Sequence, residues 1–211
     1  MFLYKVNSKK EKLENFKIAI SSTVKSLSNS SKIEVSFGNQ ISKTENKIIK
    51  LPDLNSLENK LNYSEIRAIA DSKSLMVRFS DEKIFKNYEP VGNISKRLYK
   101  ISEKIRCEKI GSNYFKGVKN NIEKFYKQRI SELDLKKSED KIIESFENFL
   151  RVQFLDLKND KETEKKLRTF KKDLGDQFRG KIVELKELAL DQDKFNSIIS
   201  KLISDMSLDE N

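Results

Sequence analysis

The chain contains no histidine, and it has a single cysteine, Cys107, among its 211 residues. Without histidine, the sequence can supply neither a Ser-His or Cys-His nucleophile pair, nor a histidine general base, nor an imidazole metal ligand. One cysteine cannot form an intrachain disulfide, a CxxC redox motif or a cysteine zinc site. These absences exclude several of the commonest catalytic and metal-binding chemistries.

Glycine is also scarce, with six residues, and the sequence contains neither GxGxxG nor GxxxxGK[ST]. A standard phosphate-binding loop is therefore not expected. No apolar run approaches the roughly 18 residues that a membrane span needs, and the N-terminus lacks the apolar centre of a signal peptide. We expect a cytoplasmic protein with no membrane-spanning segment, no self-contained active site and no cofactor or metal bound by the chain itself.

Charged residues, by contrast, are abundant in the sequence. Charged residues make up 36% of the chain, and the net charge is +10. Residues 1–130 carry 27 basic and 14 acidic side chains, whereas residues 131–211 carry 16 and 19. The excess is greatest in residues 92–130, where 11 basic side chains face three acidic ones. A basic stripe of this kind indicates an anionic partner, although a general bias towards lysine would produce the same composition.

Apolar spacing predicts a mostly α-helical bundle with one small β-hairpin near the N-terminus. The first helix is expected over residues 8–28, with Ser8 and Glu11 as its capping box. Two short strands are expected within about residues 32–51, joined by a turn at Gly38-Asn39-Gln40. Further helices begin near Asn62, after Gly92, near residue 116 and after residue 138, and Asp191 is expected to cap the last one.

The predicted organisation is a single domain over residues 1–211. Helices and the hairpin occupy residues 8–131. After a polar break at residues 136–140, a C-terminal helical subdomain follows over residues 138–208. One of the helices in the first part is expected to end near Gly111.

Several short segments form an ordered set of motifs along the chain. They are Arg67–Leu75, Tyr88–Pro90, Arg106–Gly111 and Gly117–Ile122, together with the entry strand Ile33–Phe37 and the tail Asp191–Leu208. In content and order these segments resemble the CobT subunit of aerobic cobaltochelatase. In that family we expect an Ala-Asp-Ser/Ala segment, an Arg-x-Glu-x-Ile/Leu-Gly helix end and a Gly-Val-x-x-Asn-Leu helix start. The resemblance runs from about residue 12 to residue 211 and corresponds to the N-terminal region of the family.

The resemblance implies a role in a multi-subunit enzyme. CobT works with an AAA+ ATPase subunit, CobS, and a large corrin-binding subunit, CobN. The complex uses ATP and Mg²⁺ to insert its substrate, cobalt(II), into hydrogenobyrinic acid a,c-diamide during cobalamin biosynthesis. A typical CobT continues into an acidic linker and a von Willebrand factor A domain with a metal site, which this sequence does not contain. We therefore interpret the chain as the non-catalytic N-terminal region of such a subunit, acting in complex assembly.

The candidate partner-binding residues lie in the basic segment. They are Lys96, Arg97, Lys100, Lys104, Arg106 and Glu108. The four lysines and arginines up to residue 104 are expected to face an acidic surface of a partner or the carboxylates of the corrin. Arg106 and Glu108 are interpreted as one ion pair, either buried or at an interface where two helices meet at Gly111, or as a purely structural helix-end salt bridge.

Two other classes of function stay open at this stage. A nucleic-acid-binding protein would suit the basic charge, but no RRM, KH or zinc-finger motif supports it, so nucleic acid is not the expected partner. Its binding would weaken steeply between about 50 and 200 mM salt. A basic helical adaptor for another AAA+ ATPase, unrelated to metal chelation, would fit the same sequence.

Overall fold

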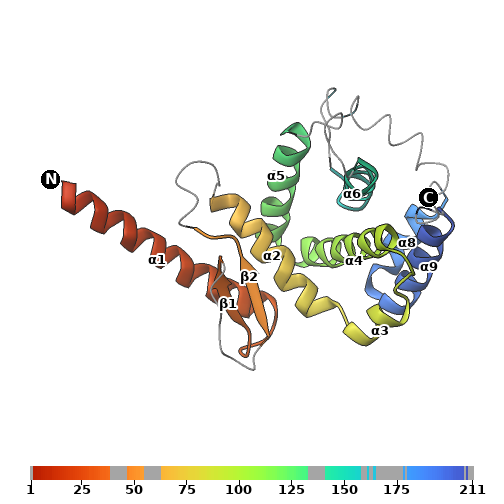
Figure 1. Ribbon diagram of the computed structural model, residues 1–211, viewed down its shortest axis with the longest axis horizontal. Coiled ribbons are helices and arrows are strands. Elements are labelled where there is room, and N and C mark those ends of the chain that lie inside the picture. Colours follow the sequence, from red (N-terminus) through yellow and green to blue (C-terminus); the bar gives the residue numbers. More distant parts are fainter. Residues whose placement is uncertain are drawn as a thin grey trace. The chain divides into compact units, whose positions relative to one another are not determined.

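The computed structural model describes residues 2–38, 47–54, 63–132, 141–157, 161, 164, 178, 180–206 and 208 (Figure 1). Most of these residues are helical, and the remaining regular structure is one small sheet, which confirms the predicted fold class. The chain divides into two compact units, unit 1 over Met1–Arg78 and unit 2 over Phe79–Asn211. Each unit has its own apolar core.

Unit 1 combines helix α1 (Phe2–Leu27), strands β1 (Glu34–Phe37) and β2 (Ile48–Leu51), and almost all of helix α2 (Tyr63–Phe79). The apolar stripe predicted for the first helix is real: Ile20 and Val24 are buried, and they pack with Ile66 and Ala70 of α2 in one core cluster. The helix begins at Phe2, however, so Ser8 lies inside it and does not cap it. A Ser-x-x-Glu pattern marks a helix start only where the preceding residues leave the helix, and no glycine or proline interrupts residues 2–7.

The predicted β-hairpin is wrong, because the two strands pair in parallel. Glu34 lies opposite Ile48, and Phe37 lies opposite Leu51. The Gly38 amide extends the ladder by donating to the Leu51 carbonyl at 2.9 Å. A hairpin turn connects antiparallel strands in two to five residues, whereas ten residues separate Phe37 from Ile48, enough to return to the start of a four-residue strand. The other two residues of the expected turn, Asn39 and Gln40, lie outside the described residues.

Unit 2 is built around one long helix. It contains α3 (Glu82–Asn87), α4 (Asn93–Tyr114), α5 (Lys116–Glu132), α6 (Lys141–Phe154), α8 (Ile182–Glu187), the 3₁₀ helix η2 (Leu188–Leu190) and α9 (Gln192–Ser204). Helix α4 contacts α5, α6, η2 and α9 (Figure 1). Its residues Leu98, Tyr99 and Ile105 join Phe146, Phe178 and other buried side chains in a single core cluster. Helix α4, before residue 132, and helices α6, α8 and α9, after it, therefore share one core.

Local sequence sets several helix boundaries in unit 2. The Asp81 side chain accepts hydrogen bonds from the Lys83 and Ile84 amides and so caps α3, a short helix that the sequence did not predict. Asp191 caps α9, as predicted, by accepting from the Lys194 amide at 3.2 Å. Both carboxylates satisfy amides that have no partner within the helix.

The predicted helix end at Gly111 is wrong, because α4 continues to Tyr114 and Gly111 is buried within it. A glycine inside a helix costs only about 1 kcal/mol relative to alanine, and packing against neighbouring helices can exceed that cost. Among the helices in the described part of the chain, none is both long enough and apolar enough to cross a membrane.

Candidate partner-binding surface

Helix α4 exposes a row of positive charges on its first three turns. Lys96, Arg97 and Lys100 are all exposed. Their spacing of three and four residues places Lys96 or Arg97 directly beside Lys100 on one side of a helix. Lys96 makes a long ion pair with Glu89, at 3.8 Å. We call Lys96, Arg97 and Lys100 the basic stripe; they are three of the six residues that the sequence analysis selected.

Lys104 continues the basic stripe by one turn but lies in different surroundings. Its side chain is only partly exposed. Desolvation lowers the pKa of its ammonium, and the charge of Arg151 lowers it further, against the opposite influence of Glu108. Lys104 therefore stands between the exposed basic stripe and a buried group of charges beneath it.

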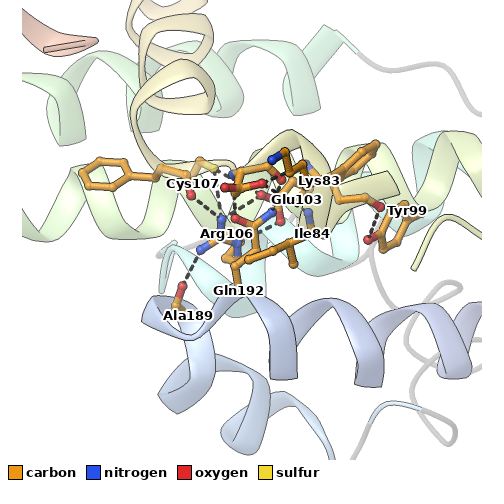
Figure 2. A network of polar contacts seen from close by, with 11 residues as sticks. Lys83, Ile84, Tyr99, Glu103, Arg106, Cys107, Ala189 and Gln192 are labelled. Atoms are coloured by element: carbon orange, nitrogen blue, oxygen red, sulfur yellow. Dashed lines mark hydrogen bonds and ion pairs between the residues drawn. The ribbon is translucent and has the colours of Figure 1, made fainter. Parts of the chain in front are cut away.

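Arg106 is buried and reaches from α4 towards Ala189 (Figure 2). Its guanidinium pairs with Glu103, one turn earlier, through Nε and Nη2 at 2.8 and 2.7 Å. The two side chains are 1% and 0% exposed. The remaining donors reach two backbone carbonyls, that of Ala189 at 2.7 Å and that of Phe79 at 2.6 Å. One side chain thus joins the centre of α4 to Phe79, the first residue of unit 2, and to η2.

A second set of hydrogen bonds in the same region joins α3 to α4 and α9 (Figure 2). The Gln192 side chain accepts from the Asp81 amide at 2.7 Å and donates to the Asp81 carbonyl at 3.0 Å. The Tyr99 hydroxyl donates to the Phe85 carbonyl at 3.0 Å. Burial raises the pKa of Tyr99, and the nearby Glu103 charge adds to this effect. These bonds hold the start of α4 in a fixed position relative to α3 and α9.

Glu108 lies at the centre of the other buried charge cluster. It accepts from Arg151 Nη1 at 2.5 Å and from the Tyr126 hydroxyl at 3.2 Å. Arg151 also donates to Glu147 through Nη2 at 2.7 Å, and its guanidinium carbon lies 3.3 Å from the centre of the Tyr126 ring. Neither Glu108 nor Arg151 is exposed. Desolvation lowers the pKa of the Arg151 guanidinium, but Glu108, Tyr126 and Glu147 together outweigh it and raise this pKa above its usual value.

The interpretation of Arg106 and Glu108 as one ion pair is wrong. Residues two positions apart point to different sides of a helix, so Arg106 pairs with Glu103 and Glu108 pairs with Arg151. Because both side chains are buried, neither lies on the surface of unit 2. The sequence did contain a signal for part of this arrangement, because Glu103 and Arg106 lie three residues apart and Glu147 and Arg151 lie four apart. Nothing local connects Glu108 with Arg151, 43 residues later.

The buried ion pairs fix the position of α4 within unit 2, and their net contribution to the free energy of unfolding is small. Removing two charges from water is costly, so a buried ion pair can contribute little net stability even when its hydrogen bonds are good. The pairs do fix geometry: Arg106 and Glu108 tie the same helix to α6, α5 and η2 from two sides. The basic stripe therefore lies on a helix whose position is fixed by the buried contacts of Arg106 and Glu108.

A pH dependence follows from Glu147. Desolvation alone would raise the pKa of this carboxyl, but Arg151, Lys104 and Arg129 together lower it below the usual 4.5. A carboxyl whose pKa is lower in the folded chain stabilises that state above its unfolded pKa. This contribution is lost as the pH falls through the folded pKa. We expect the free energy of unfolding to fall less between about pH 5 and 3 in Glu147→Gln than in the unmodified chain.

Urea unfolding at a series of pH values measures this difference. Glu187→Gln is the control, because it removes an exposed carboxylate from the same unit. It should leave the pH dependence of unfolding close to that of the unmodified chain. Equal pH dependence for Glu147→Gln and the unmodified chain would show that the ion pair with Arg151 contributes nothing in acid.

The described residues contain no group of three or more cysteine, aspartate or glutamate side chains that could hold a metal ion. The geometry instead offers a fixed helix with a positively charged outer face.

Comparison with known proteins adds one finding. A family model described as "Cobalamin biosynthesis protein CobT" matches residues 10–211, which is most of the chain. No solved structure matches the chain.

Proposed function

Since the chain belongs to the CobT family of cobalamin biosynthesis proteins, we propose that it is a non-catalytic docking module of an ATP-dependent cobaltochelatase. In this proposal ATP hydrolysis belongs to a CobS-like AAA+ subunit, and insertion of cobalt(II) into hydrogenobyrinic acid a,c-diamide belongs to a CobN-like large subunit. The chain contributes a surface on which these subunits assemble.

One observation carries the proposal: the basic stripe lies on the helix that the buried ion pairs hold in place. Lys96, Arg97 and Lys100 are exposed on α4, while Arg106 and Glu108 fix the same helix from inside unit 2. A fixed array of charges steers an oppositely charged partner and sets the register of docking. In this proposal the basic stripe binds an acidic surface of the ATPase or of the large subunit. The carboxylates of the corrin are also negatively charged and could bind the same residues.

Reversing the basic stripe tests the proposal. We expect Lys96→Glu/Arg97→Glu/Lys100→Glu to weaken binding to the CobS-like ATPase from the same organism by at least about tenfold, because like charges would then face each other. Lys104 is left unchanged, since a carboxylate there would lie among Glu108 and Glu147 and could disturb the fold. Binding is measured by calorimetry at about 150 mM salt, with and without ATP.

The matched control reverses Lys10, Lys12 and Lys25, which are exposed on α1. It changes the net charge of the chain by the same amount, so it separates a local contact from long-range attraction. Equal binding by both variants would exclude the basic stripe as the docking surface. If the unmodified chain does not bind the ATPase or the large subunit at all, the docking role itself is wrong.

A further inference from the structure

Unit 2 has a groove on a different set of helices from the basic stripe. It has a volume of about 370 Å³ and lies between the end of α3, α8, η2 and α9. The half-buried side chains of Tyr88, Leu188 and Ile198 form its floor, since all three also pack against the core cluster of unit 2. The more exposed side chains of Glu184, Glu187 and Asp193 form its rim.

Two exposed apolar side chains, which we call the apolar ridge, lie on α8 and η2, the elements that form one edge of the groove. Val183 and Leu190 are 64% and 72% exposed, which is high for side chains of this kind. Val183 lies four residues before Glu187, so the two share one side of α8. Leu190 follows in η2, three residues after Glu187. Apolar contact area therefore extends beyond the floor of the groove along its α8 edge.

The charge of the groove is opposite to that of the chain. Its lining carries Glu184, Glu187 and Asp193 with one cation, Lys194, and Glu184 also pairs with the neighbouring Lys181 at 2.7 Å. Glu187 and Asp193 therefore supply the excess negative charge, whereas the whole chain carries +10. Lys194 is itself engaged by Asp191 at 3.0 Å. Asp193 is held at the groove by the Tyr88 hydroxyl, which donates to it at 3.0 Å. Carboxylates around an apolar floor complement a ligand that is both cationic and apolar.

We propose that this groove binds a lysine- or arginine-bearing amphipathic helix of a partner protein. Such a helix would place its apolar side on Leu188 and Ile198 and on the neighbouring ridge, with its cations beside Glu184 and Glu187. A small cation would meet the carboxylates but leave Val183 and Leu190 in water. The groove is thus a second docking surface, opposite in charge to the basic stripe, and it does not depend on the cobaltochelatase assignment.

The probe is a fluorescein-labelled helical peptide of about 14 residues, made of leucine and lysine with the leucines on one side. Titrated into the full chain and followed by fluorescence anisotropy, it should bind with a Kd on the order of 10 µM. We expect Glu184→Gln/Glu187→Gln to weaken binding about tenfold, and Val183→Ser/Leu190→Ser to weaken it severalfold. The second variant changes only exposed side chains, so loss of folding does not obscure the result.

The matched control is Glu11→Gln/Glu14→Gln on α1. Glu14 pairs with Lys17 at 2.8 Å, as Glu184 pairs with Lys181 at 2.7 Å, and both pairs of glutamates lie three residues apart. This variant should bind the peptide like the unmodified chain. Equal weakening by both glutamate variants would show attraction to the chain without a site and would overturn the proposal. A serine variant with unchanged affinity would exclude the apolar ridge, and self-association lost in Glu184→Gln/Glu187→Gln would make a second copy the occupant instead.

Discussion

Replacing Arg151 with methionine is expected to lower the free energy of unfolding of unit 2 by about 3–5 kcal/mol. The substitution nearly preserves side-chain volume but removes the guanidinium that donates to Glu108, so this buried carboxylate loses its 2.5 Å bond from Arg151 and the positive charge that goes with it. Urea unfolding followed by circular dichroism measures the loss, and hydrogen exchange of the α4 amides assigns it to unit 2.

Arg129 provides the matched control for Arg151. Arg129 and Arg151 both pair with Glu147, but the Arg129 pair is longer, at 3.9 Å, and the Arg129 side chain is 49% exposed. Arg129→Met should therefore change stability by less than about 1 kcal/mol, as is usual for surface ion pairs. A further variant, Glu108→Gln/Arg151→Met, removes both buried charges and should recover much of the lost stability. Equal effects of Arg151→Met and Arg129→Met would contradict the buried position of Arg151.

The second large effect is expected at Arg106, where even lysine should cost about 3 kcal/mol. The guanidinium donates to Glu103 through Nε and Nη2. It also donates to two backbone carbonyls, that of Ala189 through Nη1 and that of Phe79 through Nη2. A lysine ammonium has three donors on one atom and cannot reach groups arranged around a planar fork. Arg106→Lys would therefore leave buried acceptors, among them the Ala189 carbonyl, without a donor.

Arg97→Lys is the control for Arg106→Lys, because Arg97 is exposed on the same helix. It should change the free energy of unfolding by no more than about 0.5 kcal/mol. The unfolding midpoint in urea, with hydrogen exchange at η2 as a local readout, compares the two variants. If Arg106→Lys retained the stability of the unmodified chain, the junction between α4 and η2 would not depend on the guanidinium geometry.

These two experiments also bear on the proposed docking role. If α4 is held from beneath by Arg106 and Glu108, loosening either pair should weaken partner binding without touching the basic stripe. Binding would then fall in Arg106→Lys although Lys96, Arg97 and Lys100 are intact. Such a result would separate the position of the helix from its charge as two requirements for docking.

Local sequence signals predicted much of the molecule. The apolar stripe containing Ile20 and Val24 gave the first long helix, and α5 follows its predicted range within one residue. Asp191 caps α9 as its side-chain chemistry indicates. These features depend on residues within one or two helical turns, so a single sequence contains the information for them.

The sequence failed where the outcome depended on distant residues. Two strands of four residues have no local preference for parallel or antiparallel pairing, so Glu34–Phe37 and Ile48–Leu51 could not reveal their orientation. No local feature of the sequence indicates that Glu108 pairs with Arg151. The helix end predicted at Gly111 is wrong because neighbouring residues do not show which other helices will pack against α4. The sequence did not predict the groove formed by Tyr88, Leu188 and Ile198, because its floor is made of segments that lie about a hundred residues apart.

The helical character of this protein, its positive charge and its family can be inferred from the amino-acid sequence, because periodicity, composition and ordered motifs are properties of neighbouring residues. Which charges are exposed and which are buried depends on how the helices pack. Along α4, Lys100 and Arg106 differ little as sequence, yet one is exposed and the other holds Glu103 in the interior. The physical reason is that burial depends on which elements pack against a side chain, and that is fixed by contacts between distant parts of the chain.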